Sequence, residues 1–184
     1  IKVFAGSSTG DLLVDDDGGL DQIISRLSRR AAFHSEDEFR LRERVGHQVA
    51  GDAASHPVWR DVEAAVLCTT RLCRIARRHG KRIHILHVST RDELPILAQY
   101  RDVATVEVTP HHLTLSGDDY ARLGTRLQMN PPVRGAEHRD GLWAAIQSGL
   151  VDVLGSDHAP HTLEEKAKPY PQSPSGMTGV QTLV

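Results

Sequence analysis

The sequence predicts an α/β fold built on a parallel sheet. Two observations predict it: short apolar and β-branched runs recur along the 184 residues, and segments with a helical period separate most of them. Strands that alternate with helices in this way are typical of parallel sheets joined by crossover helices. Five such strands can be counted in the sequence, whereas a closed TIM barrel needs eight.

The N-terminal part is predicted to contain two strands, at 1–4 and 31–33, with a helix over 18–29 between them. Apolar residues at positions 20, 23, 24 and 27 indicate the helix. A polar loop is expected at 6–10. The stretch 34–56 has no clear period, and loops of that length are usually functional or disordered. Its charged residues between Glu36 and Arg44 predict a solvated, salt-bridged surface, with a lid or an oligomer contact as alternatives.

The rest of the chain continues the alternation of strands and helices. Strands are expected over 83–88, 103–108 and 151–154, and helices over 58–79, 117–123 and 136–148. Thr90 and Glu93 have the spacing of a capping box that begins a further helix. Pro95 is expected to kink that helix. The Thr109-Pro-His-His112 segment is expected to form a turn.

Composition argues against two classes of partner. Lysine plus arginine number 22 and aspartate plus glutamate 24, so the formal net charge is −2 and there is no basic excess for nucleic acid. No apolar run approaches the roughly 20 residues of a membrane-spanning helix, and no signal peptide is visible. Cys68 and Cys73 are expected to be buried free thiols of a reducing compartment. Because the sequence starts at Ile1 within an apolar strand and stops within an element, we expect a piece of a longer protein.

Polar residues fall where the predicted strands end. His34 closes the second strand, His87 the third and Asp157 the fifth, while Lys2 lies in the first. The carboxyl ends of parallel strands meet on one side of the sheet and build active sites there. Each residue alone has an ordinary structural explanation, such as a hydrogen-bonded histidine or a turn aspartate. Together, imidazoles and a carboxylate at one set of strand ends predict a divalent metal site, with zinc as the metal.

The block Gly155-Ser-Asp-His-Ala-Pro-His-Thr-Leu-Glu-Glu-Lys166 strongly resembles the signature of the dihydroorotases, a family of the amidohydrolase superfamily. Blocks at 1–4, 33–36, 86–90, 108–113 and 129–132 are similar to the family's blocks and follow the same order. The resemblance implies a (β/α)8 TIM-barrel metal-dependent hydrolase, of which this chain holds about the last five β/α units. Residues 1–184 would then be a partial amidohydrolase domain, without its N-terminal strands and its C-terminal end.

The resemblance also implies a role for each matching residue. Lys2 matches a lysine that many members carbamylate, which gives a carboxylate that bridges two zinc ions. His34 and His87 match the histidines of the more exposed metal. Asp157 matches the aspartate that binds the buried metal and acts as general base and acid. The residues that match substrate contacts are Asn130, His161, Ser175 and Gly176.

The implied reaction is the zinc-dependent, reversible cyclisation of N-carbamoyl-L-aspartate to L-dihydroorotate, a cytoplasmic step of de novo pyrimidine biosynthesis. A metal-bridged hydroxide is a strong nucleophile at neutral pH, and Asp157 would move its proton to the leaving nitrogen. A cationic His161 would pair with the substrate carboxylate. The family's His-x-His pair, with an arginine and an asparagine that grip the substrate, would precede residue 1 and is absent from this sequence.

Two alternatives remain open. One is a cyclic amidohydrolase of the hydantoinase, dihydropyrimidinase or allantoinase type, which would not need the cation that His161 offers. The other is a non-catalytic dihydroorotase-like subunit that scaffolds aspartate transcarbamoylase, against which the retained ligand positions argue. Expected partners are the small-molecule substrate, with a second copy of the chain and aspartate transcarbamoylase as further candidates.

Overall fold

The computed structural model describes residues 1–6 and 12–183, in which five parallel strands form one sheet in chain order. The strands are β1 (Lys2–Phe4), β2 (Ala31–His34), β3 (Ile83–Ile85), β4 (Ala104–Val108) and β5 (Val153–Leu154). The predicted α/β class and its five parallel strands are therefore confirmed. Residues 7–10 of the predicted polar loop lie outside the described residues.

Helices follow the strands along the chain. They are α1 (Asp17–Ser25), α2 (Glu38–Arg44), α3 (His56–Trp59), α4 (Val62–Arg78), α5 (Leu94–Gln99), α6 (Pro110–Thr114), α7 (Tyr120–Leu123), α8 (Ala136–Gln147) and α9 (Leu163–Lys166). Short 3-10 turns occur at Val45–His47, Ala53–Ser55, Arg91–Glu93, Gly117–Asp119, Gly124–Leu127 and Val180–Thr182. Within the described residues, no helix is long and apolar enough to cross a membrane.

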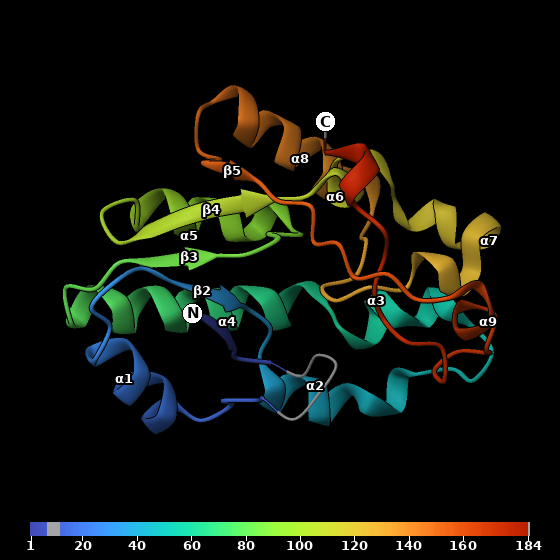
Figure 1. Cartoon of the computed structure of the whole chain (residues 1–184), viewed down its shortest axis with the longest axis horizontal. Coiled ribbons are helices and arrows are strands. Elements are labelled where there is room, and N and C mark those ends of the chain that lie inside the picture. The colour runs from blue at the N-terminus through green and yellow to red at the C-terminus, as the bar shows by residue number, and fades with distance from the viewer. Residues whose placement is uncertain (7–11, 184) are drawn as a thin grey trace.

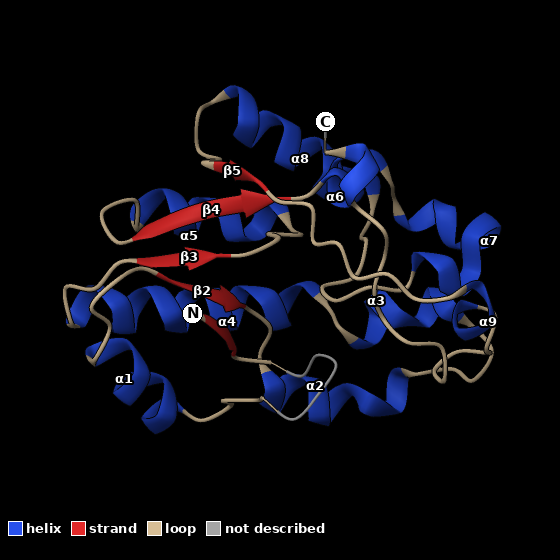
Figure 2. Cartoon of the chain, in the orientation of Figure 1, coloured by secondary structure: helices blue, strands red, loops and turns tan. Residues whose placement is uncertain are grey.

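The main hydrophobic core covers one face of the sheet. Val3, Phe33, Ile85 and Val106 are paired in register across four strands, and all four side chains are buried in this core. Helices α4 and α5 run behind the sheet in Figures 1 and 2, and α1 lies beyond β1. The strands point toward the side where α2, α3, α6, α7 and α9 gather, so the carboxyl ends of the strands lead into the region of short helices.

The opposite face of the sheet carries polar side chains. Lys2, Ala32, His84 and Thr105 occupy one register row across the first four strands. His84 bonds through Nδ1 to the Thr105 hydroxyl at 2.8 Å and through Nε2 to the Glu107 carboxylate at 3.1 Å. Because side chains alternate between the two faces along a strand, residues two positions further along point to the same polar side.

The predicted helix over 58–79 is two helices, which corrects that expectation. The short α3 ends at Trp59, and α4 begins only at Val62. The side chain of Asp61 accepts a hydrogen bond from the backbone N–H of Ala64 and so caps α4. This break places Arg60 between the two helices, where its side chain is 2% exposed.

Three further local predictions are wrong in whole or in part. The capping box is only half formed: the Thr90 side chain accepts from Asp92 N rather than from Glu93 N, while the Glu93 carboxylate accepts from the Thr69 hydroxyl and from the backbone of Thr90. Pro95 lies in the first turn of α5, where the missing N–H is tolerated, so it produces no kink. The expected turn at His111 and His112 is helix α6, capped by Thr109.

Removal of the cap of α1 tests how much local signals contribute to this fold. The Asp16 carboxylate accepts from Gly19 N at 2.8 Å at the start of the helix. We expect Asp16→Ala to lower the free energy of unfolding by about 1 kcal/mol, the usual effect of losing such a cap. Urea unfolding would measure the change. Asp16→Asn keeps an acceptor and should stay within about 0.5 kcal/mol of the original protein.

Candidate functional site at the strand ends

Two predicted metal ligands meet where β2 and β3 end. His34 is the last residue of β2, and His87 follows β3 by two residues. Their rings are buried, and Nδ1 of His34 lies 3.1 Å from Nε2 of His87. The other nitrogen of His87, Nδ1, is buried without a hydrogen-bond partner. The sequence expectation that these two imidazoles converge is therefore matched by their geometry.

The predicted solvated surface is wrong at its first residue. Glu36 is fully buried, and its carboxylate lies 3.0 Å from His34 Nε2. The Arg60 guanidinium binds the same carboxylate through Nε at 3.1 Å and Nη2 at 2.6 Å. Burial alone would raise the pKa of Glu36, but Arg60 and His34 hold that pKa well below its usual value. Glu36 is thus an ionised carboxylate in the interior.

Neighbouring acidic residues of the same segment are also buried. Asp37 is 8% and Glu38 6% exposed, and Asp37 caps helix α2 by accepting from Arg40 N. The sequence offered little warning, because acidic residues between arginines are usually solvated. The signal that was available is the position of Glu36, two residues after a strand-end histidine.

Backbone strain marks two of the predicted ligands. Among the described residues, His87 (φ 37°) and Asp157 (φ 39°) are the non-glycine residues with positive φ. Such conformations cost of order 1–3 kcal/mol and occur mainly where function or packing imposes them. Because strand β3 ends at Ile85 rather than at the predicted position 88, the backbone of His87 is free to turn its ring toward His34.

Charge places Asp157 and Lys2 near this histidine pair. Burial raises the pKa of Asp157, and the neighbouring Lys2, His34 and His111 oppose that rise. Burial likewise lowers the pKa of His87, and His34 and Lys2 lower it further. Lys2 is exposed, and its ammonium lies 4.8 Å from the centre of the Phe4 ring. We call Lys2, His34, His87 and Asp157 the strand-end cluster.

Two of the four predicted substrate contacts line a pocket of about 270 Å3. Asn130 and Ser175 line this pocket together with His56, Trp59 and Arg60. His56 is 1% exposed, and its Nε2 contacts the Asn130 amide oxygen at 2.9 Å. Burial, then the charge of Arg60, lower the pKa of His56 to about 4, so its ring is neutral at physiological pH.

A lysine holds the loop that carries the other predicted contacts. Lys166 Nζ donates to the carbonyl oxygens of Gln128, Pro174 and Gly176 at 2.9–3.1 Å. His161 Nε2 lies 3.2 Å from the Ser175 carbonyl oxygen. Gly176 has φ 148°, and a Cβ there would lie 2.6 Å from a backbone oxygen, so the position requires glycine. Lys166 ends the dihydroorotase-like block 155–166, and nothing in the local sequence indicates this role for it.

The fit of a metal can be tested on this arrangement. Two zinc–nitrogen bonds of 2.0–2.1 Å in a tetrahedral site imply roughly 3.3 Å between nitrogens, close to the 3.1 Å between His34 Nδ1 and His87 Nε2. The buried carboxylate on His34 Nε2 also suits a metal-binding imidazole, whereas Nδ1 of His87 has no such partner. Among the described residues, however, no group of three or more His, Cys, Asp or Glu is assembled for a metal. The spacing of the two histidine nitrogens therefore fits a zinc ion. A complete set of metal ligands is not assembled around them among the described residues.

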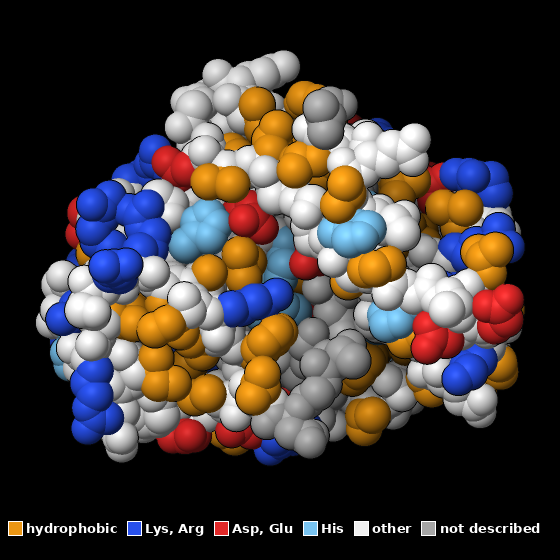
Figure 3. Space-filling model, in the orientation of Figure 1, with side chains coloured by type: hydrophobic (Ala, Val, Ile, Leu, Met, Phe, Trp, Pro, Cys, Tyr) orange, Lys and Arg blue, Asp and Glu red, His pale blue; other side chains and the backbone are white. Residues whose placement is uncertain are grey.

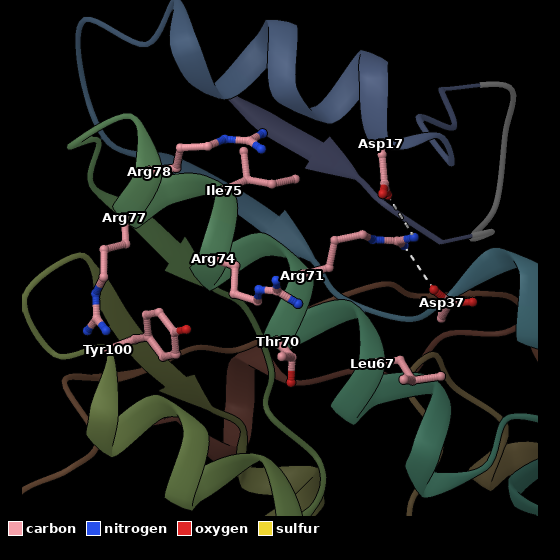
Figure 4. Close-up of a pocket in the computed structure, with 10 residues that line it drawn as sticks. All are labelled: Asp17, Asp37, Leu67, Thr70, Arg71, Arg74, Ile75, Arg77, Arg78 and Tyr100. Atoms are coloured by element: carbon pink, nitrogen blue, oxygen red, sulfur yellow. Dashed lines mark hydrogen bonds and ion pairs between the residues drawn. The ribbon is translucent and has the colours of Figure 1, made fainter.

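A larger groove, of about 800 Å3, lies elsewhere, on the outer side of α4. Figure 4 shows arginines of α4 and Tyr100 around it. Arg71 pairs with Asp17 and Asp37, and Arg77 stacks on the Tyr100 ring at 3.8 Å, so these side chains largely interact with one another. By contrast, Figure 3 shows histidine, acidic and basic side chains gathered near the middle of another face.

Comparison with known proteins shows which sequences are similar to this chain. The dihydroorotase of Halobacterium salinarum is 38% identical over 191 residues, and that of Methanosarcina mazei is 33% identical over 196; both alignments cover this whole chain. The chain spans 43% of the length of each of these two relatives. A search against protein-family models found no match.

Solved structures show the same fold. L-hydantoinase from Arthrobacter aurescens superposes with a TM-score of 0.91 at 26% identity, covering 98% of this chain and 43% of that protein. Dihydropyrimidinase from Brevibacillus agri superposes with a TM-score of 0.87 at 23% identity, covering 98% of this chain and 42% of that protein. The five parallel strands with their helices therefore correspond to part of the TIM barrel of a cyclic amidohydrolase.

The fold thus corresponds to a class, the TIM-barrel amidohydrolases represented by these solved structures. In sequence the chain is similar over its whole length to dihydroorotases, at 33% and 38% identity for the two relatives above.

Proposed function

We propose that the protein carrying this chain is a dihydroorotase that interconverts N-carbamoyl-L-aspartate and L-dihydroorotate with zinc. The observation that carries the proposal is the meeting of His34 and His87 at the strand ends, in a chain aligned over its whole length with dihydroorotases. The strained backbone of Asp157 at the end of β5 supports a functional role for that residue. We infer that residues 1–184 form part of one barrel domain.

The residues of the strand-end cluster would hold the metals. His34 Nδ1 and His87 Nε2 would bind one ion, Asp157 a second, and Lys2 would bridge them after carbamylation. Two zinc ions would activate a hydroxide and polarise the amide carbonyl. Asp157 would accept the proton of the nucleophile and return it to the ring nitrogen.

The pocket beside Asn130 would receive the substrate. A neutral His56 fixes the Asn130 amide, and Lys166 fixes the carbonyl groups around Ser175 and Gly176. These contacts leave little freedom to the groups that would meet the ring, and such preorganisation is what a small polar substrate requires.

The first experiment is an assay of the intact protein, supplied with zinc and bicarbonate, on dihydroorotate, hydantoin and allantoin. Preferred hydrolysis of dihydroorotate is expected. Preference for hydantoin or allantoin would favour the second candidate, a cyclic amidohydrolase of another type, which the similarity to L-hydantoinase supports. Folded, zinc-loaded protein without activity on any ring would instead favour a non-catalytic subunit that scaffolds aspartate transcarbamoylase.

His161 is expected to determine selectivity for a carboxylated ring. Its Nε2 already lies beside the Ser175 carbonyl, and its Nδ1 is 3.8 Å from Glu165. We expect His161→Asn to raise the KM for dihydroorotate by about 10–100-fold, the range for a lost hydrogen bond to a charged group. Steady-state kinetics on dihydroorotate and on an uncharged dihydropyrimidine would check this. An equal loss on both rings would contradict a carboxylate contact.

The cellular location and the partners of the protein are also part of the proposal. We infer a cytoplasmic protein, in keeping with the buried free thiols of Cys68 and Cys73. Partners beyond the small-molecule substrate would be a second copy of the chain or aspartate transcarbamoylase. Size measurements on the intact protein, alone and mixed with aspartate transcarbamoylase, would distinguish these assemblies.

A further inference from the structure

We propose that Glu36 and Arg60 form a positioning pair that fixes the orientation and tautomer of His34 for metal binding. The inference rests on the proposed function, because it takes His34 and His87 as ligands of one cation. Neither Glu36 nor Arg60 would touch the metal or the substrate's reacting atoms. Their contribution would be to hold one nitrogen of His34 ready for the metal.

The hydrogen bonds determine which nitrogen of His34 carries a proton. Glu36 is bound to a guanidinium through both carboxylate oxygens, and an ionised carboxylate only accepts hydrogen bonds. His34 Nε2, 3.0 Å from that carboxylate, must therefore donate. In the neutral ring this leaves the lone pair on Nδ1, the atom that faces His87 Nε2. Metal-binding histidines commonly donate their other N–H to a carboxylate in this way.

Arg60 holds the carboxylate in place. Its planar guanidinium matches the geometry of a carboxylate, which a lysine would not. The backbone around Arg60 is fixed in turn, because Arg134 donates to the Arg60 carbonyl at 2.8 Å and to the Ser89 hydroxyl at 3.1 Å. Arg60 also borders the pocket beside Asn130. The pair therefore links a wall of the proposed substrate pocket to a proposed metal ligand.

Zinc titration of the intact protein, stripped of metal, tests the proposal. We expect Glu36→Gln to weaken zinc binding about 10-fold and Glu36→Ala about 100-fold, the range known for lost partners of metal-binding histidines. Asp102→Asn is the matched control, since Asp102 pairs with Arg77 at the surface and contacts no histidine. It should bind zinc as the original protein does. Unchanged zinc affinity in both Glu36 variants would overturn the proposal.

A second measurement does not depend on metal. Nitrogen-15 imidazole spectra of the metal-free protein should show His34 protonated at Nε2, and Glu36→Ala should give a mixture of tautomers. A proton on Nδ1 in the original protein would refute the proposal. Failure of the proposed function is separable: a protein that binds zinc through this pair but hydrolyses no dihydroorotate leaves the positioning role intact. A protein that binds no zinc would overturn the positioning role.

Discussion

Asp157→Asn is expected to lower the rate of dihydroorotate hydrolysis by about 10²–10⁴-fold, the usual contribution of a positioned general base. Asparagine has nearly the same shape but cannot take up a proton from the nucleophile. Asp157 follows the end of β5 in a strained backbone conformation, and nearby positive charges act on its carboxylate. The measurement is kcat for the intact protein, with zinc content determined on the same samples.

Zinc content decides how the loss is interpreted. If Asp157→Asn keeps its zinc and loses activity, the Asp157 carboxylate acts mainly in proton transfer. If both fall together, it acts mainly as a ligand. Asp102→Asn is again the control for a changed surface charge and should retain full activity. An Asp157→Asn protein as active as the original would exclude Asp157 from the chemistry.

The sequence predicted the parts of the fold that depend on local pattern. Alternating apolar runs identified all five strands, because buried parallel strands tolerate few polar residues. Strand-end position also led to His34, His87 and Asp157, since chain order fixes where strand ends lie. The resemblance to dihydroorotases supplied the roles of these residues, which spacing alone would not have given.

What the sequence missed depends on contacts between distant segments. Apart from its place two residues after a strand-end histidine, little in the local sequence predicts the burial of Glu36, because that burial depends on Arg60, which lies 24 residues further along the chain. The burial of His56 is likewise not visible in the local sequence, because its partner Asn130 is 74 residues away. The break between α3 and α4 was missed because the apolar period continues through it, and only the cap at Asp61 marks the true start.

Arg60→Met is expected to lower the free energy of unfolding by about 3–5 kcal/mol, because it leaves the Glu36 carboxylate buried without its guanidinium partner. Methionine fills much of the arginine's volume, so the loss reports the missing charge rather than a cavity. Urea unfolding of the intact protein would measure it. Arg77→Met is the control, since the Arg77–Asp102 pair is about half exposed and worth at most about 1 kcal/mol.

The pH dependence of this difference identifies Glu36 as its cause. In the original protein the pKa of Glu36 is held below its ordinary value of 4.5, so the stability it contributes is complete above that pH and is lost as pH falls. Without Arg60, burial should raise the pKa of Glu36, so the carboxylate of the variant would become protonated as pH falls. Protonation removes the buried charge and so reduces the destabilisation of the variant. The gap between the two proteins should therefore be widest at neutral pH and narrow on acidification toward and below 4.5. A gap independent of pH would mean that Arg60 stabilises the fold through packing alone.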